Sequence, residues 1–113
     1  MVSAADTYSN TYNYVKHFPS GSSLSKIAHR CKSSNRSYTG FRIAQPQKLA
    51  SLYVRVKKHN TNTELTSGVH HYTASTSFKK LQLDQGQKGL VIQVDAANKN
   101  SIGQEYAGVI DFN

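Results

Sequence analysis

The stretch SLYVRVKK at residues 51–58 alternates apolar and polar side chains. Successive side chains of a strand point to opposite faces, so a period of two is typical of a half-buried strand. Leu52, Val54 and Val56 are expected to face the core, and Tyr53, Arg55 and Lys57 to face solvent. The stretch therefore predicts a strand of an antiparallel sheet that is covered on one face.

Shorter stretches on both sides of residues 51–58 have a similar pattern. They predict strands over residues 38–44, 69–74, 78–83, 90–94 and 106–112, and residues 7–18 are predicted as strand or coil. Polar turns separate these stretches, as is usual between short strands. The turn over residues 84–87 predicts a hairpin that joins the strands on either side of it.

Residues 22–32 show a different period. Their apolar side chains fall at positions 24, 27, 28 and 31, which is the spacing of one face of a helix. Ser22 or Ser23 can cap the first turn, and Lys32 lies where the helix dipole favours a cation. The pattern predicts a short helix with Cys31 buried on its apolar face.

The order of these elements predicts a mainly β fold. We expect residues 1–113 to form a single domain, an antiparallel sandwich or small barrel of five to seven short strands with one short N-terminal helix. A two-layer α+β domain is the alternative. No apolar run reaches the length of about 18 residues that a membrane-spanning helix needs. A single cysteine excludes a disulfide framework within the chain and a cysteine-based zinc site.

Charge is distributed unevenly along the chain. The 14 lysines and arginines outnumber the 6 acids, and the net charge is +8. No acid lies between Asp6 and Glu64, whereas ten basic residues do. A basic half of this kind attracts polyanions, because it raises their local concentration. Nucleic acid, an acidic glycan and an anionic membrane surface are the partners expected of it.

The side chains that would bind such a partner combine cations with aromatic rings. An aromatic ring beside two cations on one strand face can stack on a base or a sugar and contact phosphate. The predicted ligand-binding residues are Tyr53, Arg55 and Lys57, with Tyr38 and Arg42 on a neighbouring strand and Lys26, Arg30 and Lys32 on the helix. The bland interpretation is that these residues form an ordinary solvent-exposed surface.

Catalytic motifs are absent from the sequence. Five histidines include the pair His70 and His71, which a strand would point to opposite sides. No metal-binding spacing of histidines occurs, and the six acids are too far apart to suggest paired-carboxylate chemistry. We therefore expect no cofactor and no metal, and a protein that is more a binding module than an enzyme. Catalysis would require two histidines to meet in space.

Three functional hypotheses follow. The favoured one is a non-enzymatic polyanion-binding module that binds nucleic acid phosphates through its basic N-terminal half. The second is a secreted or surface β-module that binds carbohydrate or membrane, such as a lectin, a toxin subunit or a virion component. It would explain why Ser, Thr, Asn and Gln make up 37 of the 113 residues. The third is a small basic ribonuclease-like toxin.

The N-terminal residues contain no basic segment followed by an apolar run, so no signal peptide is expected in this chain. The polar composition is compatible with a secreted or virion protein. The sequence leaves the compartment and the oligomeric state open.

Overall fold

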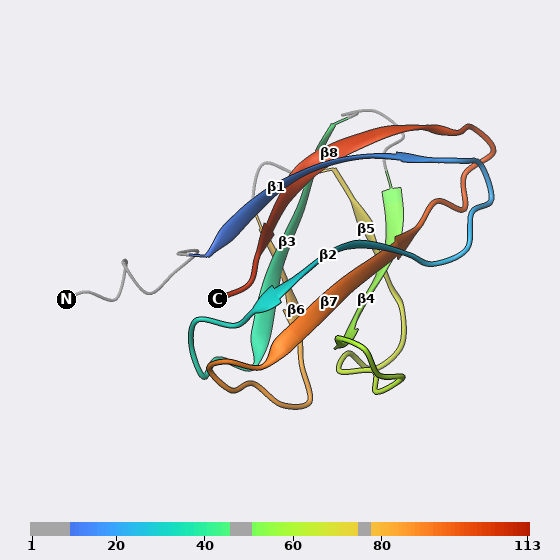
Figure 1. Ribbon diagram of the computed structural model, residues 1–113. Coiled ribbons are helices and arrows are strands. Elements are labelled where there is room, and N and C mark those ends of the chain that lie inside the picture. Colours follow the sequence, from blue (N-terminus) through green and yellow to red (C-terminus); the bar gives the residue numbers. More distant parts are fainter. Residues whose placement is uncertain (1–9, 46–50, 75–77) are drawn as a thin grey trace.

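The protein consists of two β-sheets, as the computed structural model in Figure 1 shows. The structure describes residues 10–45, 51–74 and 78–113, and all regular elements in these ranges are strands. The strands are β1 (Thr11–Phe18), β2 (Ser25–Cys31), β3 (Tyr38–Gln45), β4 (Ser51–Lys58), β5 (His70–Thr73), β6 (Lys79–Gln82), β7 (Val91–Ala97) and β8 (Gln104–Asp111). A search of these ranges finds no helix that could span a membrane.

The strands pair in the jelly-roll arrangement. β1 pairs with β8, β2 with β7, β3 with β6 and β4 with β5, all antiparallel. A chain folded back on itself at the β4–β5 connection produces these four pairs. When this folded chain wraps around the core, alternate pairs lie in opposite sheets. Sheet A has the strand order β1-β8-β3-β6, and sheet B has the order β2-β7-β4-β5. The predicted mainly β, sandwich-like fold is confirmed.

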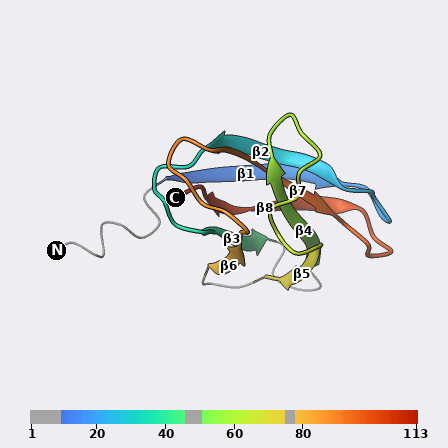
Figure 2. The same cartoon turned by 90° about the horizontal axis from the view of Figure 1, so that it is seen from below.

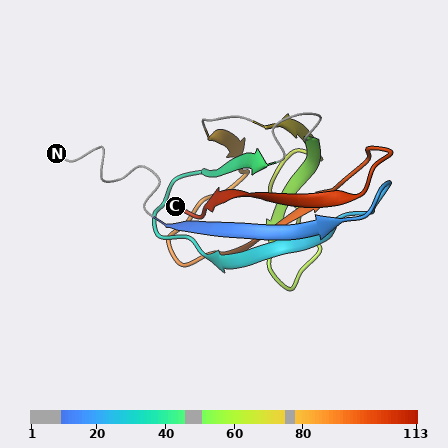
Figure 3. The ribbon, with the colours of Figure 1, turned by 90° about the horizontal axis from the view of Figure 1, so that it is seen from above.

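Figures 2 and 3 show how the edges of the two sheets meet. β1 and β2 lie side by side at one edge, and the short strands β5 and β6 lie at the other. Arg30 on β2 joins the first edge, because its guanidinium donates to the Thr11 carbonyl of β1 at 3.1 Å and to the Asn10 side chain at 3.0 Å. A side chain thus connects two strands that do not pair through their backbones.

The core fills the space between the sheets. β4 contributes Leu52, Val54 and Val56, all fully buried, so the alternation predicted for residues 51–58 is confirmed. Aromatic side chains fill sheet A's inner face. Tyr14 stacks on Phe41 with ring centroids 5.8 Å apart.

The predicted helix over residues 22–32 is wrong, because this segment contains β2. The register of β2 against β7 shifts between Lys26 and Ala28, which is a β-bulge. The bulge lets both Ile27 and Ala28 pack against the core. One face of a helix also carries apolar residues at two adjacent positions, i+3 and i+4, so the sequence of β2 has the spacing of a helix. The predicted burial of Cys31 is wrong for the same reason, and its side chain is exposed.

The strand count and the hairpin also need correction. The described residues contain eight strands, not five to seven, because β2 replaces the predicted helix, and the α+β alternative fails with it. β6 and β7 do not form the predicted hairpin. β6 pairs with β3 in sheet A, whereas β7 pairs with β2 and β4 in sheet B. The loop between them crosses from one sheet to the other.

Candidate binding surfaces

Tyr53, Arg55 and Lys57 lie on the outer face of sheet B. Arg55 is not a free cation there. Its Nε donates to Asp95 at 3.1 Å, and its Nη1 lies 3.7 Å from a carboxylate oxygen of Glu64. Asp95 comes from β7, and Glu64 from the segment after β4, so acids from later in the chain neutralise the centre of the predicted basic stripe.

A chain of polar contacts crosses the same face. The rings of His29 and His59 stack with centroids 3.7 Å apart. The Lys26 ammonium lies 3.3 Å from His29 Nδ1, and His59 Nδ1 lies 2.9 Å from Gln93 Oε1. Desolvation lowers the pKa of His29, and the neighbouring His59 and Lys26 lower it further.

The stacked histidines do not have the geometry of an acid–base pair. A general base and a general acid that cleave a phosphodiester must reach different oxygens of the same phosphate. The rings of His29 and His59 are in van der Waals contact and nearly parallel, at 10°. No phosphate fits between rings this close. The two histidines that ribonuclease chemistry would need to bring together do meet, but as a stacked pair.

Two predicted cations of β2 and the segment after it have structural roles. Arg30 holds the β1–β2 edge, with its guanidinium 5.4 Å from the centre of the Tyr12 ring. Lys32 is buried, and its ammonium donates to the carbonyls of Tyr38 and Asn113. Burial lowers the pKa of Lys32, although Asp111 nearby acts in the opposite direction. Neither side chain is presented to a ligand.

Tyr38 and Arg42 lie on β3, in sheet A, and not beside the Tyr53 stripe. The structure surrounds them with further cations and a second aromatic ring. Lys80 on β6 pairs with Gly40, a position without a side chain, and its ammonium lies 4.7 Å from the centre of the Tyr38 ring. We call this surface the β3–β6 patch, and its residues are Arg36, Tyr38, Arg42, Phe78 and Lys80.

Contacts between cations and rings hold the β3–β6 patch together. Arg36 donates to the Tyr38 hydroxyl at 3.2 Å, and its guanidinium lies over the same ring. The guanidinium of Arg42 lies 5.9 Å from the centre of the Phe78 ring. The aromatic rings therefore position the cations and are covered by them. Sequence reasoning missed Lys80 because it belongs to the less basic half of the chain, and only the β3–β6 pairing brings it to β3.

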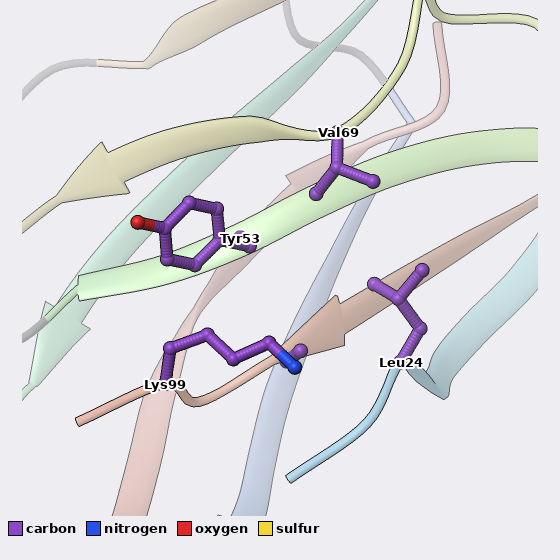
Figure 4. Close-up of a pocket in the computed structure, with 5 residues that line it drawn as sticks. Leu24, Tyr53, Val69 and Lys99 are labelled. Atoms are coloured by element: carbon purple, nitrogen blue, oxygen red, sulfur yellow. The ribbon is translucent and has the colours of Figure 1, made fainter. Parts of the chain in front are cut away.

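A pocket of about 350 Å³ lies on the outer face of sheet B, lined by Leu24, Tyr53, Val69, Ala97 and Lys99. Figure 4 shows the Tyr53 ring, Val69 and Leu24 around the hollow and the Lys99 side chain along its rim. The ring of His71 contacts Tyr53 with centroids 4.7 Å apart. Of the residues predicted to bind a ligand, only Tyr53 lines this pocket.

No group of three His, Cys, Asp or Glu side chains that could hold a metal occurs within residues 10–45, 51–74 and 78–113. The chain matches no family model, no curated protein and no solved structure. Two surfaces on opposite sheets are therefore the candidates for function. These are the β3–β6 patch and the pocket beside Tyr53.

Proposed function

We propose that the protein is a non-enzymatic polyanion-binding module that binds nucleic acid phosphates on the β3–β6 patch. The observation that carries the proposal is the convergence of Arg36, Arg42 and Lys80 on one outer face. Two of these cations come from the acid-free part of the sequence, and the third is brought to them by strand pairing.

The dimensions of the patch suit a chain of phosphates. Extended backbone advances about 3.3 Å per residue, so the outward-facing positions from Tyr38 to Arg42 on β3 form a row of roughly 13 Å, and Arg36 adds its charge at the Tyr38 end. Lys80 enters this row opposite Gly40. A single strand of nucleic acid carries one charge every 3.4 Å or so of helix axis, and a row of this length therefore meets several phosphates.

The patch favours phosphate contacts over base stacking. Arg36 and Lys80 both lie against the Tyr38 ring, so its faces are not open as a platform for a base. Cation contacts with phosphate position a nucleic acid without reading its sequence. We therefore expect binding that depends strongly on salt and weakly on base sequence.

The local charge supports the β3–β6 patch over the Tyr53 stripe. Arg55, at the centre of the stripe, is paired with Asp95 and Glu64. Among the described residues, Asp111 acts on Arg36 from a buried position and offsets part of the arginine's charge. Lys80 is exposed at the short strand β6 and makes no ion pair within the described part of the chain.

Salt-dependent binding of a labelled single-stranded RNA oligomer tests the proposal. Fluorescence anisotropy between about 50 and 200 mM salt should give a straight line of log affinity against log salt. In the double variant Arg42→Gln, Lys80→Gln the slope should fall by about 1.4, or about 0.7 for each lost phosphate contact on a single strand.

Lys57→Gln is the matched control, because Lys57 is a strand lysine on the outer face of the other sheet. It should leave both affinity and slope unchanged. A wild-type slope near zero contradicts polyanion binding. An equal loss in Lys57→Gln and in the double variant contradicts the assignment to the β3–β6 patch. Circular dichroism of each variant shows that the fold is intact.

A further inference from the structure

The pocket on sheet B is a hollow above a small side chain. Ala97 on β7 pairs with Tyr53 on β4 and therefore shares its face of the sheet. Leu24, just before β2, and Val69, just before β5, also line the hollow. A short side chain between three larger ones leaves the space of about 350 Å³, the lower end of the range for small-molecule sites.

The walls of the hollow are apolar and its rim carries a cation. Tyr53 is 37% exposed and Val69 is 42% exposed, so both present apolar surface to a ligand. The Tyr53 ring lies between its cross-strand neighbours Ala97 and His71, which holds it in place. The Lys99 side chain runs along the hollow, as Figure 4 shows.

The shape of the hollow restricts the chemistry of the ligand. It is open to solvent on its outer side, so one side of a bound molecule stays in water. An aliphatic chain would gain only from the side that faces the walls, because its outer side stays in water and contributes nothing to binding. A sugar ring has one face of C–H groups to set against Tyr53 and hydroxyls around its edge to face water.

The next row of the sheet supplies polar groups for those hydroxyls. Arg55 and Asp95 pair across β4 and β7, about 7 Å along the strand from the Tyr53–Ala97 pair. The Arg55 side chain is 30% exposed and its Nε is fixed by Asp95. Its Nη1 lies beside Glu64, which leaves the N–H groups of Nη2 to donate to a sugar hydroxyl.

We infer that this pocket binds one ring of a glycan that carries a carboxylate. Tyr53 covers the C–H face of the ring, Leu24 and Val69 hold its sides, and Lys99 pairs with the carboxylate. The inference is independent of the proposed function, because the β3–β6 patch lies on the other sheet.

Tetragalacturonate is the probe, and its fully methyl-esterified form is the matched ligand without charge. Calorimetric titration of the wild-type protein should show the acid binding about threefold or more tightly than the ester, the effect of one exposed ion pair. Lys99→Gln should remove this preference. Tyr53→Ala should weaken binding of both ligands about tenfold, whereas Tyr53→Phe should retain it.

Tyr12→Ala is the control for loss of an aromatic side chain, because Tyr12 is as exposed as Tyr53, at 37%, but lies on β1. It should bind tetragalacturonate as the wild type does. Absence of binding to either ligand, or wild-type affinity in Tyr53→Ala, overturns the site. A preference for the acid that persists in Lys99→Gln overturns the role of Lys99. The double variant Arg42→Gln, Lys80→Gln should keep tetragalacturonate binding even where it loses RNA, so the two proposals fail separately.

Discussion

Asn98 closes one end of the sandwich, and its replacement by alanine should destabilise the whole fold. It follows β7 and is fully buried. Its side-chain amide donates to the Ile102 carbonyl at 2.9 Å and to the Phe18 carbonyl at 3.3 Å. Its Oδ1 accepts from the Asn100 backbone at 3.0 Å and lies 3.3 Å from the Tyr106 hydroxyl. One side chain thus connects the end of β1, the β7–β8 loop and β8.

The expected loss follows from these contacts. Each hydrogen bond contributes about 0.5–1.5 kcal/mol net, and a buried group left without a partner costs about 1–3 kcal/mol. Asn98→Ala removes the side-chain bonds and leaves the Phe18 and Ile102 carbonyls without this donor. We expect the free energy of unfolding to fall by about 3–5 kcal/mol, a large part of the roughly 5–15 kcal/mol that holds a domain folded.

Urea unfolding followed by circular dichroism measures this loss. With a urea dependence of about 1.5–2 kcal/mol per molar, the midpoint should fall by about 2 M. Tyr106→Phe, which removes one hydroxyl of the same cluster, should cost about 1 kcal/mol and keeps the test open where Asn98→Ala does not fold. Asn62→Ala, in the exposed loop after β4, should stay within about 0.5 kcal/mol of the wild type. A loss below about 1 kcal/mol in Asn98→Ala would refute the reasoning.

Three further predictions concern the sheets. Arg30→Met keeps an apolar stem but loses the bond to the Thr11 carbonyl, so the urea midpoint should fall by the equivalent of about 1–2 kcal/mol; an unchanged midpoint would show that the β1–β2 edge needs no such link. Burial raises the pKa of Asp111, so its contribution to stability is complete below the unfolded pKa and is lost as pH rises through the folded one. The Asp111→Asn variant has no carboxyl to titrate at this position and does not lose this stability. Its free energy of unfolding in urea, relative to that of the wild type, should therefore increase between about pH 3 and pH 7. If the difference between the two free energies does not change with pH, the raised pKa is contradicted. A Cβ on Gly108 would overlap the Arg42 carbonyl, so Gly108→Ala should separate β3 from β8 and cost more than about 3 kcal/mol; a normal unfolding curve would contradict this contact.

The alternation of apolar and polar side chains predicts a strand correctly where one face of that strand packs against the core. Residues 51–58 show it most clearly, because β4 lies inside sheet B with its apolar side chains against the core. It failed at β2, where the bulge after Lys26 places Ile27 and Ala28 together against the core. A bulge is produced by pairing with another strand, here β7, and a local pattern does not contain that strand.

The sequence did not predict which strands pair with each other, because most paired strands lie far apart in the chain. Among the described strands, β4 and β5 are the consecutive pair that bond to each other, and the other pairs join distant segments. The hairpin expected around residues 84–87 was therefore wrong, and the turn of this loop lies at Lys88 and Gly89, after a bend at Asp84. Short-range turn signals indicate that the chain reverses, but not which sheet the next strand joins.

The predicted ligand-binding residues lie on two different sheets for the same reason. Tyr38 and Arg42 share β3 and remain together, because spacing within one strand is a local property. The lysine that completes their surface, Lys80, arrives only through the β3–β6 pairing. Conversely, Arg55 lost its place as the centre of a basic stripe when β7 brought Asp95 beside it.

By itself the sequence determined the strand-rich character of the chain, the apolar face of β4 and the uneven distribution of charge. These depend on side-chain periodicity and composition, which act over a few residues. Tertiary structure alone decided the jelly-roll order, the neutralisation of Arg55, the burial of Lys32 and the hollow above Ala97. Each of these results from contacts between segments distant in the chain, and the free energy of such contacts depends on how the two sheets pack and not on the neighbours of a residue in sequence.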